Sequence, residues 1–161
     1  MKRKGQTWVL DIFLGVGIFL FAFSLLVKSY GEASSESDIL EDMSINAKMI
    51  SEMLLSEGIP VDWNSTDVRQ PGLISEGRIS HYKLQELKAM DYDEVRSIFR
   101  TRYDYLIDIQ DSSGASLQTI GPAGVTIGNL PGLEPDNVLK MNRLSVYNSS
   151  PVRLVVVVWE G

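Results

Sequence analysis

The chain has 161 residues, a formal net charge of −6 at pH 7 and no cysteine. The absence of cysteine excludes disulfides, thiolate metal sites and cysteine nucleophiles. The acidic balance argues against nucleic-acid binding, because a nucleic-acid partner requires a basic footprint. The length allows one apolar N-terminal segment and one folded domain with a single core.

An apolar run over residues 7–27 follows the basic residues Lys2, Arg3 and Lys4 and is interrupted only by Asp11. About 20 apolar residues span a bilayer as a helix, in which every backbone N–H and C=O is paired internally. The basic residues before the run place the N-terminus in the cytoplasm and the remainder outside. We therefore expect a single-pass membrane protein with an extracytoplasmic head.

The junction Lys2-Arg3-Lys4-Gly5-Gln6 resembles the class III signal peptide of type IV pilin-like proteins, particularly the archaeal ones. A secretory signal peptide has a shorter apolar core followed by a small-residue cleavage site, which this chain lacks. The resemblance implies that a prepilin peptidase cuts between Gly5 and Gln6 on the cytoplasmic side. It also implies that the apolar helix stays on the mature protein and bundles with other pilin subunits. An uncleaved signal anchor of an unrelated surface protein is the alternative.

Asp11 is a candidate assembly residue. Pilins usually carry a glutamate at the fifth mature position, where it is thought to meet the N-terminal amine of a neighbouring subunit. Here Leu10 occupies the fifth position and Asp11 the sixth, which turns the carboxylate about 100° around the helix. An acid within a membrane segment is costly and is a functional candidate by default. The alternative is that Asp11 lies shallowly and reaches water at the cytoplasmic interface.

Residues 29–58 are predicted to continue the same helix as an amphipathic segment. The whole helix is expected from about Thr7 to Glu57, and the serine-rich segment after Gly31 is a possible hinge within it. Ile45 and Met49 form a narrow second apolar strip that contacts either solvent or a neighbouring subunit. Gly58 then ends the helix. The broad apolar stripe has helical spacing and is expected to pack on the head: Ile39, Met43, Ala47, Ile50 and Leu54.

Residues 59–161 predict a globular head, and the fold class is α+β: a long N-terminal helix packed on an antiparallel sheet of four or five strands, with two short helices. Residues 59–80 are predicted to form a loop. Its Trp63 is expected to be buried in the core beneath the end of the helix. Ser80 and Asp91 are expected to cap the two short helices. The sequence predicts strands near residues 102–109, 116–120, 138–147 and 152–159, and a short one at 125–127. Alternation indicates the first of these, a preceding turn the second, and a continuous apolar run the last. The strand near 102–109 is expected to have one solvent-exposed face. The strand near 152–159 is expected to lie in the centre of the sheet with both faces buried.

Two N-glycosylation sequons, Asn64-Ser65-Thr66 and Asn148-Ser149-Ser150, fall in predicted loops. Asn64 and Asn148 are therefore glycosylation candidates, and two such sites suit a surface protein.

No pattern indicates an enzyme, because the chain lacks a nucleophile elbow, a P-loop, HExxH and GxGxxG. The single histidine, His81, is expected to be exposed and not a ligand. Asp91 with Asp93 and Asp104 with Asp108 are expected to be solvated pairs and not a calcium site. We expect no catalytic residue, no metal and no cofactor.

The resemblance implies a structural subunit of a type IV pilus-like filament or of its assembly machinery, and the helical stretch before residue 100 favours a minor pilin. The expected organisation is a leader (1–5), a transmembrane and assembly helix (6–28), its amphipathic continuation (29–58) and the head (59–161). The expected partners are the membrane, the prepilin peptidase and other pilin subunits, and not nucleic acid. A membrane-anchored binding or accessory ectodomain that does not polymerise is the alternative.

Overall fold

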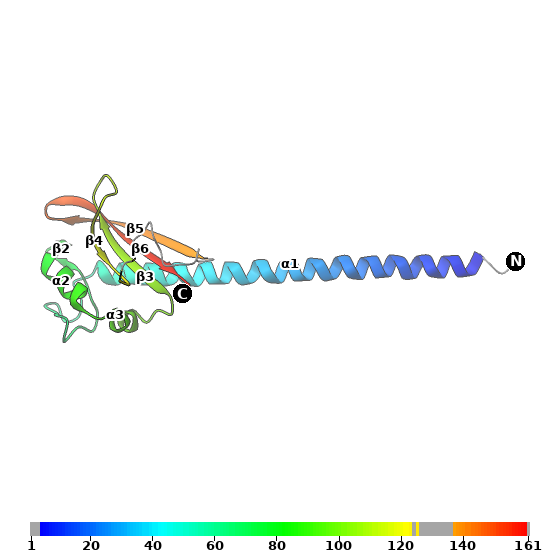
Figure 1. Cartoon of the computed structure of the whole chain (residues 1–161), viewed down its shortest axis with the longest axis horizontal. Helices are drawn as coiled ribbons and strands as arrows, with labels where there is room; N and C mark the ends of the chain where they lie inside the picture. Colours follow the sequence, from blue (N-terminus) through cyan, green and yellow to red (C-terminus); the bar gives the residue numbers. More distant parts are fainter. Residues whose placement is uncertain (1–3, 124, 126–136, 161) are drawn as a thin grey trace. The chain divides into compact units, whose positions relative to one another are not determined.

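The computed structural model describes residues 4–123, 125 and 137–160, with the side chains of residues 4–10 and 30–37 outside the description. The first helix, α1, runs from Lys4 to Leu54 (Figure 1). The expected helix is thus found, but it begins and ends slightly earlier than Thr7 and Glu57. The chain forms two compact units, residues 1–39 and 40–161, which are described separately.

In the second unit, the last part of α1 buries the predicted stripe. Met43, Ala47, Ile50 and Leu54 are each 0% exposed, whereas Ile45 on the opposite side is 58% exposed. Burial of each large side chain contributes about 1.5–3 kcal/mol relative to exposure. The stripe is therefore the main contact by which this part of α1 is held in the head.

The C-terminal end of α1 is closed by the loop that follows it. The backbone N–H of Leu73 donates to the carbonyl of Leu54 (2.7 Å), which satisfies a helix-end carbonyl that has no partner within the helix. The predicted core residue, Trp63, is 0% exposed, and its indole N–H donates to the carbonyl of Gly72 (2.7 Å). A Cβ on Gly72 would lie 2.2 Å from the backbone nitrogen of Gly58, so only glycine fits at this crossing.

The described residues form a six-stranded sheet in the order β1-β2-β5-β6-β3-β4. All neighbours are antiparallel except β2 and β5, which pair in parallel through Ile79 and Tyr147. The expectation of a wholly antiparallel sheet of four or five strands is therefore corrected. Two-residue strands inside the expected loop account for the difference, because alternation cannot be recognised over two residues. The bounds are Ile74–Ser75 (β1), Arg78–Ile79 (β2), Asp104–Gln110 (β3), Ser116–Ile120 (β4), Val138–Tyr147 (β5) and Ser150–Trp159 (β6).

Strand β6 lies between β5 and β3, the central position expected from its continuous apolar run. One face carries Leu154, Val156 and Val158 toward the helices. The other face joins a cluster of buried side chains composed of Leu106, Val125, Val155, Val157 and Trp159. The expected strand at 125–127 is not found at Val125, and residues 126 and 127 lie outside the described residues.

Strand β3 differs from expectation, because the face that was predicted to be exposed to solvent is buried. Asp108 is only 2% exposed. Its carboxylate accepts hydrogen bonds from the hydroxyls of Ser116 and Thr119 and from the amide of Gln110. Neighbouring strands on both sides supply this burial and these partners, so the carboxylate is not solvated as the sequence suggested.

Two short helices, α2 (His81–Ala89) and α3 (Tyr92–Phe99), pack on the same sheet face as the end of α1 (Figure 1). The predicted N-caps are found. Ser80 Oγ accepts from the backbone N–H of Lys83 (3.5 Å), and Asp91 Oδ1 accepts from that of Asp93 (3.0 Å). The apolar sides are buried at Leu84, Leu87, Val95 and Phe99.

Lys83 is a buried residue that no pattern predicted. It is 5% exposed, and its Nζ donates to the backbone carbonyls of Glu57 (2.7 Å) and Ile74 (2.9 Å). A buried ammonium group requires such acceptors. Lys83 therefore joins α2 to the segment that follows α1.

Candidate functional site

The part of α1 from Asp11 to Ser29 is long and apolar enough to cross a membrane, by length and composition. Its 19 residues have a mean hydropathy of 2.2, and none of its most apolar window is buried. At 1.5 Å per residue it spans about 28 Å, close to the roughly 30 Å hydrocarbon thickness of a bilayer. It is the one such helix among the described residues.

The side chains of this segment have no cover from the chain itself. Phe13 is 74% exposed, Phe19 65% and Phe21 68%. Soluble proteins rarely leave so large a continuous apolar surface in water. This exposed apolar surface is consistent with a single-pass membrane anchor.

Asp11 is exposed at the first residue of the apolar segment. An acid at this end of the segment is compatible both with a contact to another subunit and with a position at the interface, so its assembly role stays a prediction. Gly5 and Gln6 lie within the backbone of α1, with side chains outside the description. Lys2 and Arg3 lie outside the described residues, and Lys4 is the first residue of α1.

The first sequon forms a compact turn, in which the Thr66 hydroxyl is hydrogen-bonded to the Asn64 side-chain amide. Asn64 Oδ1 accepts from the backbone N–H (2.9 Å) and the hydroxyl (2.6 Å) of Thr66. The backbone N–H of Asn64 donates to Asp67 Oδ1 (2.9 Å). These bonds use the oxygen of the Asn64 amide and leave its nitrogen, the atom that a glycan would modify, out of the turn.

The second sequon lies in the tight turn between β5 and β6. Asn148 is exposed and has a φ of 50°, and Ser149 has a φ of 63°. Asparagine tolerates this left-handed region better than most residues. Both sequons are thus on loops, as expected, and their occupancy stays a prediction.

His81 is exposed, as predicted, and it also contacts the end of β5. Its Nδ1 lies 2.6 Å from Tyr147 Oη. Beside this pair is an open cavity of about 640 Å³ whose lining includes Asp111, Gln118 and Asn148. Its walls come from α2, the β3–β4 hairpin and the β5–β6 hairpin. The described residues contain no group of three or more His, Asp or Glu side chains able to hold a metal ion.

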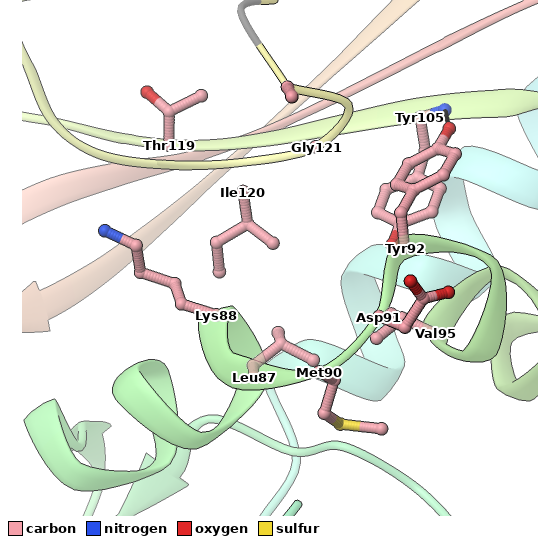
Figure 2. Close-up of a pocket in the computed structure, with 11 residues that line it drawn as sticks. Leu87, Lys88, Met90, Asp91, Tyr92, Val95, Tyr105, Thr119, Ile120 and Gly121 are labelled. Atoms are coloured by element: carbon pink, nitrogen blue, oxygen red, sulfur yellow. Dashed lines mark hydrogen bonds between the residues drawn. The ribbon is translucent and has the colours of Figure 1, made fainter.

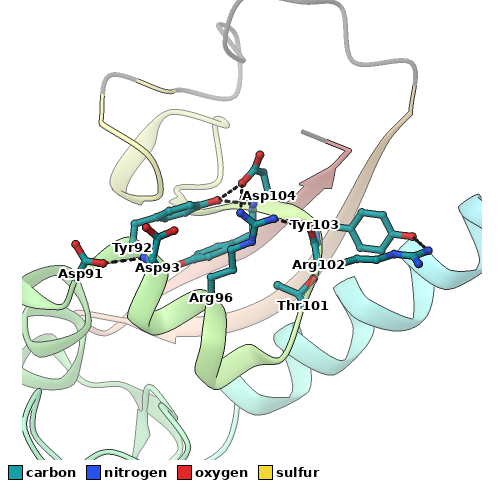
Figure 3. A network of polar contacts seen from close by, with 9 residues as sticks. Asp91, Tyr92, Asp93, Arg96, Thr101, Arg102, Tyr103 and Asp104 are labelled. Atoms are coloured by element: carbon teal, nitrogen blue, oxygen red, sulfur yellow. Dashed lines mark hydrogen bonds and ion pairs between the residues drawn. The ribbon is translucent and has the colours of Figure 1, made fainter.

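A polar network fastens α3 to β3 (Figure 3). Asp104 accepts a hydrogen bond from Tyr92 Oη (3.0 Å) and pairs with Arg96 (3.1 Å). Tyr92 Oη in turn accepts from the backbone N–H of Tyr105 (3.1 Å). Burial raises the pKa of Tyr92 above its ordinary value of 10.0, so the phenol remains protonated at neutral pH.

The same network extends to α1 within the second unit. Asp42 accepts from Tyr103 Oη (2.9 Å) and pairs with Arg102 Nη2 (2.8 Å). Arg102 also donates to Tyr103 Oη (2.7 Å). These contacts join positions about 60 residues apart, which no local pattern in the sequence could indicate. Their arrangement is that of a structural clamp, since each polar group is satisfied by a partner in the head.

A second cavity, of about 380 Å³, lies between the short helices and the β3–β4 hairpin (Figure 2). Leu87, Ile120 and the stacked rings of Tyr92 and Tyr105 form its apolar part, with ring centroids 4.8 Å apart. Lys88 and Asp91 lie at its rim.

Comparison with known proteins finds no match to a family model, a curated protein or a solved structure. The function must therefore be argued from the residues themselves. Their most informative feature is the exposed apolar segment together with the residues that precede it.

Proposed function

We propose that the chain is a structural subunit of a type IV pilus-like filament or of its assembly machinery, processed by a prepilin peptidase between Gly5 and Gln6. The observation that carries the proposal is the Lys-Arg-Lys-Gly-Gln junction directly before an apolar helix that its own chain leaves uncovered. A cut on the cytoplasmic side of this helix keeps it on the mature protein. The helix is then covered first by lipid and later by the helices of other subunits.

The head supports a display role. It has its own core in residues 40–161, and in the described residues no buried side-chain polar atom lacks a hydrogen-bond partner. The buried polar side chains of the described head are thus paired within the chain, as is usual for a folded domain. The short helices α2 and α3 depart from a plain strand-built head, which favours a minor component over the abundant filament subunit. Asn64 and Asn148 are the positions where a glycan would be displayed.

The first test is the N-terminal mass of the protein purified from its native membranes. Processing predicts that the mature chain begins at Gln6, with or without cyclisation of that glutamine. Gly5→Val should block the cut, whereas Gly15→Val is the matched control, because a Cβ at Gly15 meets nothing within 4 Å. A wild-type chain that begins at Met1 or Lys2 in cells with active prepilin peptidase would overturn the proposal and favour the anchored, non-polymerising ectodomain.

The second test separates processing from assembly. Asp11→Leu should leave the cut at Gln6 unchanged, because Asp11 lies beyond the junction, but should reduce the amount of protein in the sheared filament fraction at least several-fold. Asp38→Asn, an exposed acid further along α1, is the control and should behave as wild type. Equal recovery of the Asp11→Leu and wild-type proteins in filaments would remove Asp11 from the assembly contact.

A further inference from the structure

The most unusual group of side chains lies on the sheet face opposite to the helices, at the β3–β4 hairpin. Asp108 and Gln110 are 2% and 8% exposed. One oxygen of the Asp108 carboxylate accepts from the hydroxyls of Ser116 and Thr119, the latter at 2.9 Å. The other oxygen accepts from the amide nitrogen of Gln110 at 2.9 Å. The buried Asp108 carboxylate therefore accepts hydrogen bonds from the Ser116 hydroxyl and from the Gln110 carboxamide at the same time.

The strand register pairs the residue that carries the hydroxyl with the residue that carries the amide, at a register shift between Ile109 and Gln110. Ser116 in β4 is the cross-strand partner of Gln110 in β3. Cβ atoms of directly opposite residues are about 4.5–5.5 Å apart. An ester between the two side chains joins these Cβ atoms through four bonds of about 1.5 Å or less, which span about 5 Å when extended. A link of this length matches the separation that is typical of a cross-strand pair.

A positively charged residue, Arg153, occupies the neighbouring position on the other side of β3. Arg153 in β6 is the second cross-strand partner of Gln110. Its Nη2 is 3.2 Å from the point that a Cβ on Gly114 would occupy. Since Gly114 lies in the β3–β4 turn, the Arg153 side chain reaches from β6 toward the hairpin that contains Gln110. A guanidinium placed there stabilises negative charge that develops on the amide oxygen.

We propose that this cluster is an autocatalytic modification site that forms an ester between Ser116 Oγ and Gln110 Cδ. Asp108 takes the proton of the Ser116 hydroxyl, and Oγ attacks Cδ to give a tetrahedral oxyanion beside Arg153. Asp108 then returns the proton to Nε2, the Cδ–Nε2 bond breaks, and ammonia leaves. The new bond is Cδ–Oγ, the carboxylate is regenerated, and no oxidant, metal or cofactor is needed.

The link would secure an edge of the sheet. Strand β4 consists of residues Ser116–Ile120, and within the described part of the chain it pairs with β3 alone. The chain contains no cysteine, so a disulfide cannot perform this role. A covalent bond between β3 and β4 holds the edge strand in register independently of the filament proposed above.

The test is the mass of the full chain, purified in detergent, followed by digestion with trypsin. Loss of ammonia lowers the mass by about 17 Da. The cleavage sites leave Gln110 and Ser116 together in the peptide 103–140, separate from the N-terminal peptide. This separation matters, because cyclisation of Gln6 lowers the mass by the same amount. The proposal predicts the loss in peptide 103–140, with no fragment ions from breaks between residues 110 and 116. Hydroxylamine, which cleaves esters, should open the link and leave a hydroxamate at residue 110 and a free hydroxyl at Ser116.

Matched variants identify the atoms involved. Ser116→Ala and Gln110→Glu should give peptides of full calculated mass. Thr119→Val removes the neighbouring hydroxyl and should keep the loss, because Thr119 is not opposite Gln110. A wild-type peptide 103–140 at full mass, or a loss confined to the N-terminal peptide, would overturn the proposal, and so would persistence of the loss in Ser116→Ala.

Discussion

Two parts of the same helix sequence use their apolar residues in opposite ways. From Asp11 to Ser29 the apolar side chains surround the helix and are exposed throughout. In the last part of α1 the stripe of Met43, Ala47, Ile50 and Leu54 is fully buried in the head, whereas Ile45 on the other side of the helix is exposed. A helix that is apolar all round requires lipid or other helices, whereas an amphipathic one can be satisfied by its own domain. The difference indicates which part depends on the environment and which part folds with the head.

The largest expected effect on the head comes from the buried stripe. Ile50→Ala should lower the free energy of unfolding by about 2–5 kcal/mol, because it leaves a cavity in a close-packed core. Ile45→Ala, on the exposed side of the same helix, should change it by less than about 0.5 kcal/mol. Denaturant unfolding of the detergent-solubilised protein measures both values. Equal effects of the two substitutions would mean that the stripe is not the packed face.

The apolar segment should respond in a different assay. Phe19→Asp places a charge near the middle of the segment and is expected to cost about 2.5–3.5 kcal/mol on membrane-insertion scales. The fraction of protein recovered in membranes should fall accordingly. Ile45→Asp introduces the same charge outside the segment and should leave membrane recovery unchanged. If Phe19→Asp also remained fully in the membrane fraction, the segment would not be the anchor.

The clamp between Asp42 and β3 should have a smaller effect. Tyr103→Phe removes the hydroxyl that donates to Asp42, with an expected loss of about 0.5–1.5 kcal/mol in the free energy of unfolding. Tyr82→Phe is the matched control, since Tyr82 is 58% exposed. Thermal unfolding should distinguish the two variants, and identical melting temperatures would show that the hydroxyl contributes nothing to stability.

The smallest expected effect is a pH dependence at an exposed position. The backbone N–H of Ser65 donates to Glu86 Oε2 (2.9 Å) and lowers the pKa of Glu86 from its ordinary value of 4.5. Because the pKa is lower in the folded state, this stabilisation is present above pH 4.5 and is lost as the pH falls through the folded pKa. Glu86→Gln should therefore weaken the dependence of stability on pH in this acidic range. The control Glu94→Gln changes an exposed glutamate on α3 and should keep the wild-type dependence.

Local patterns were sufficient for much of the head. The caps at Ser80 and Asp91 depend on short-range side-chain chemistry, and both were predicted from the sequence. The strand over residues 116–120 followed from a preceding turn, and the last strand from its continuous apolar run. The candidate site was also visible locally, because length and hydropathy alone define an apolar segment that can span a bilayer.

Other features required the tertiary structure. The burial of Asp108 and Lys83 depends on partners that neighbouring strands and loops supply, so these residues looked like ordinary surface charges in the sequence. The same holds for the clamp between Asp42 and Tyr103 and for the two-residue strands β1 and β2. The sequence by itself determined the apolar segment, the helical stripe and the main strands, because periodicity and capping act over a few residues. The tertiary structure alone decided which polar groups are buried, because their hydrogen-bond partners are distant along the chain and meet only after folding.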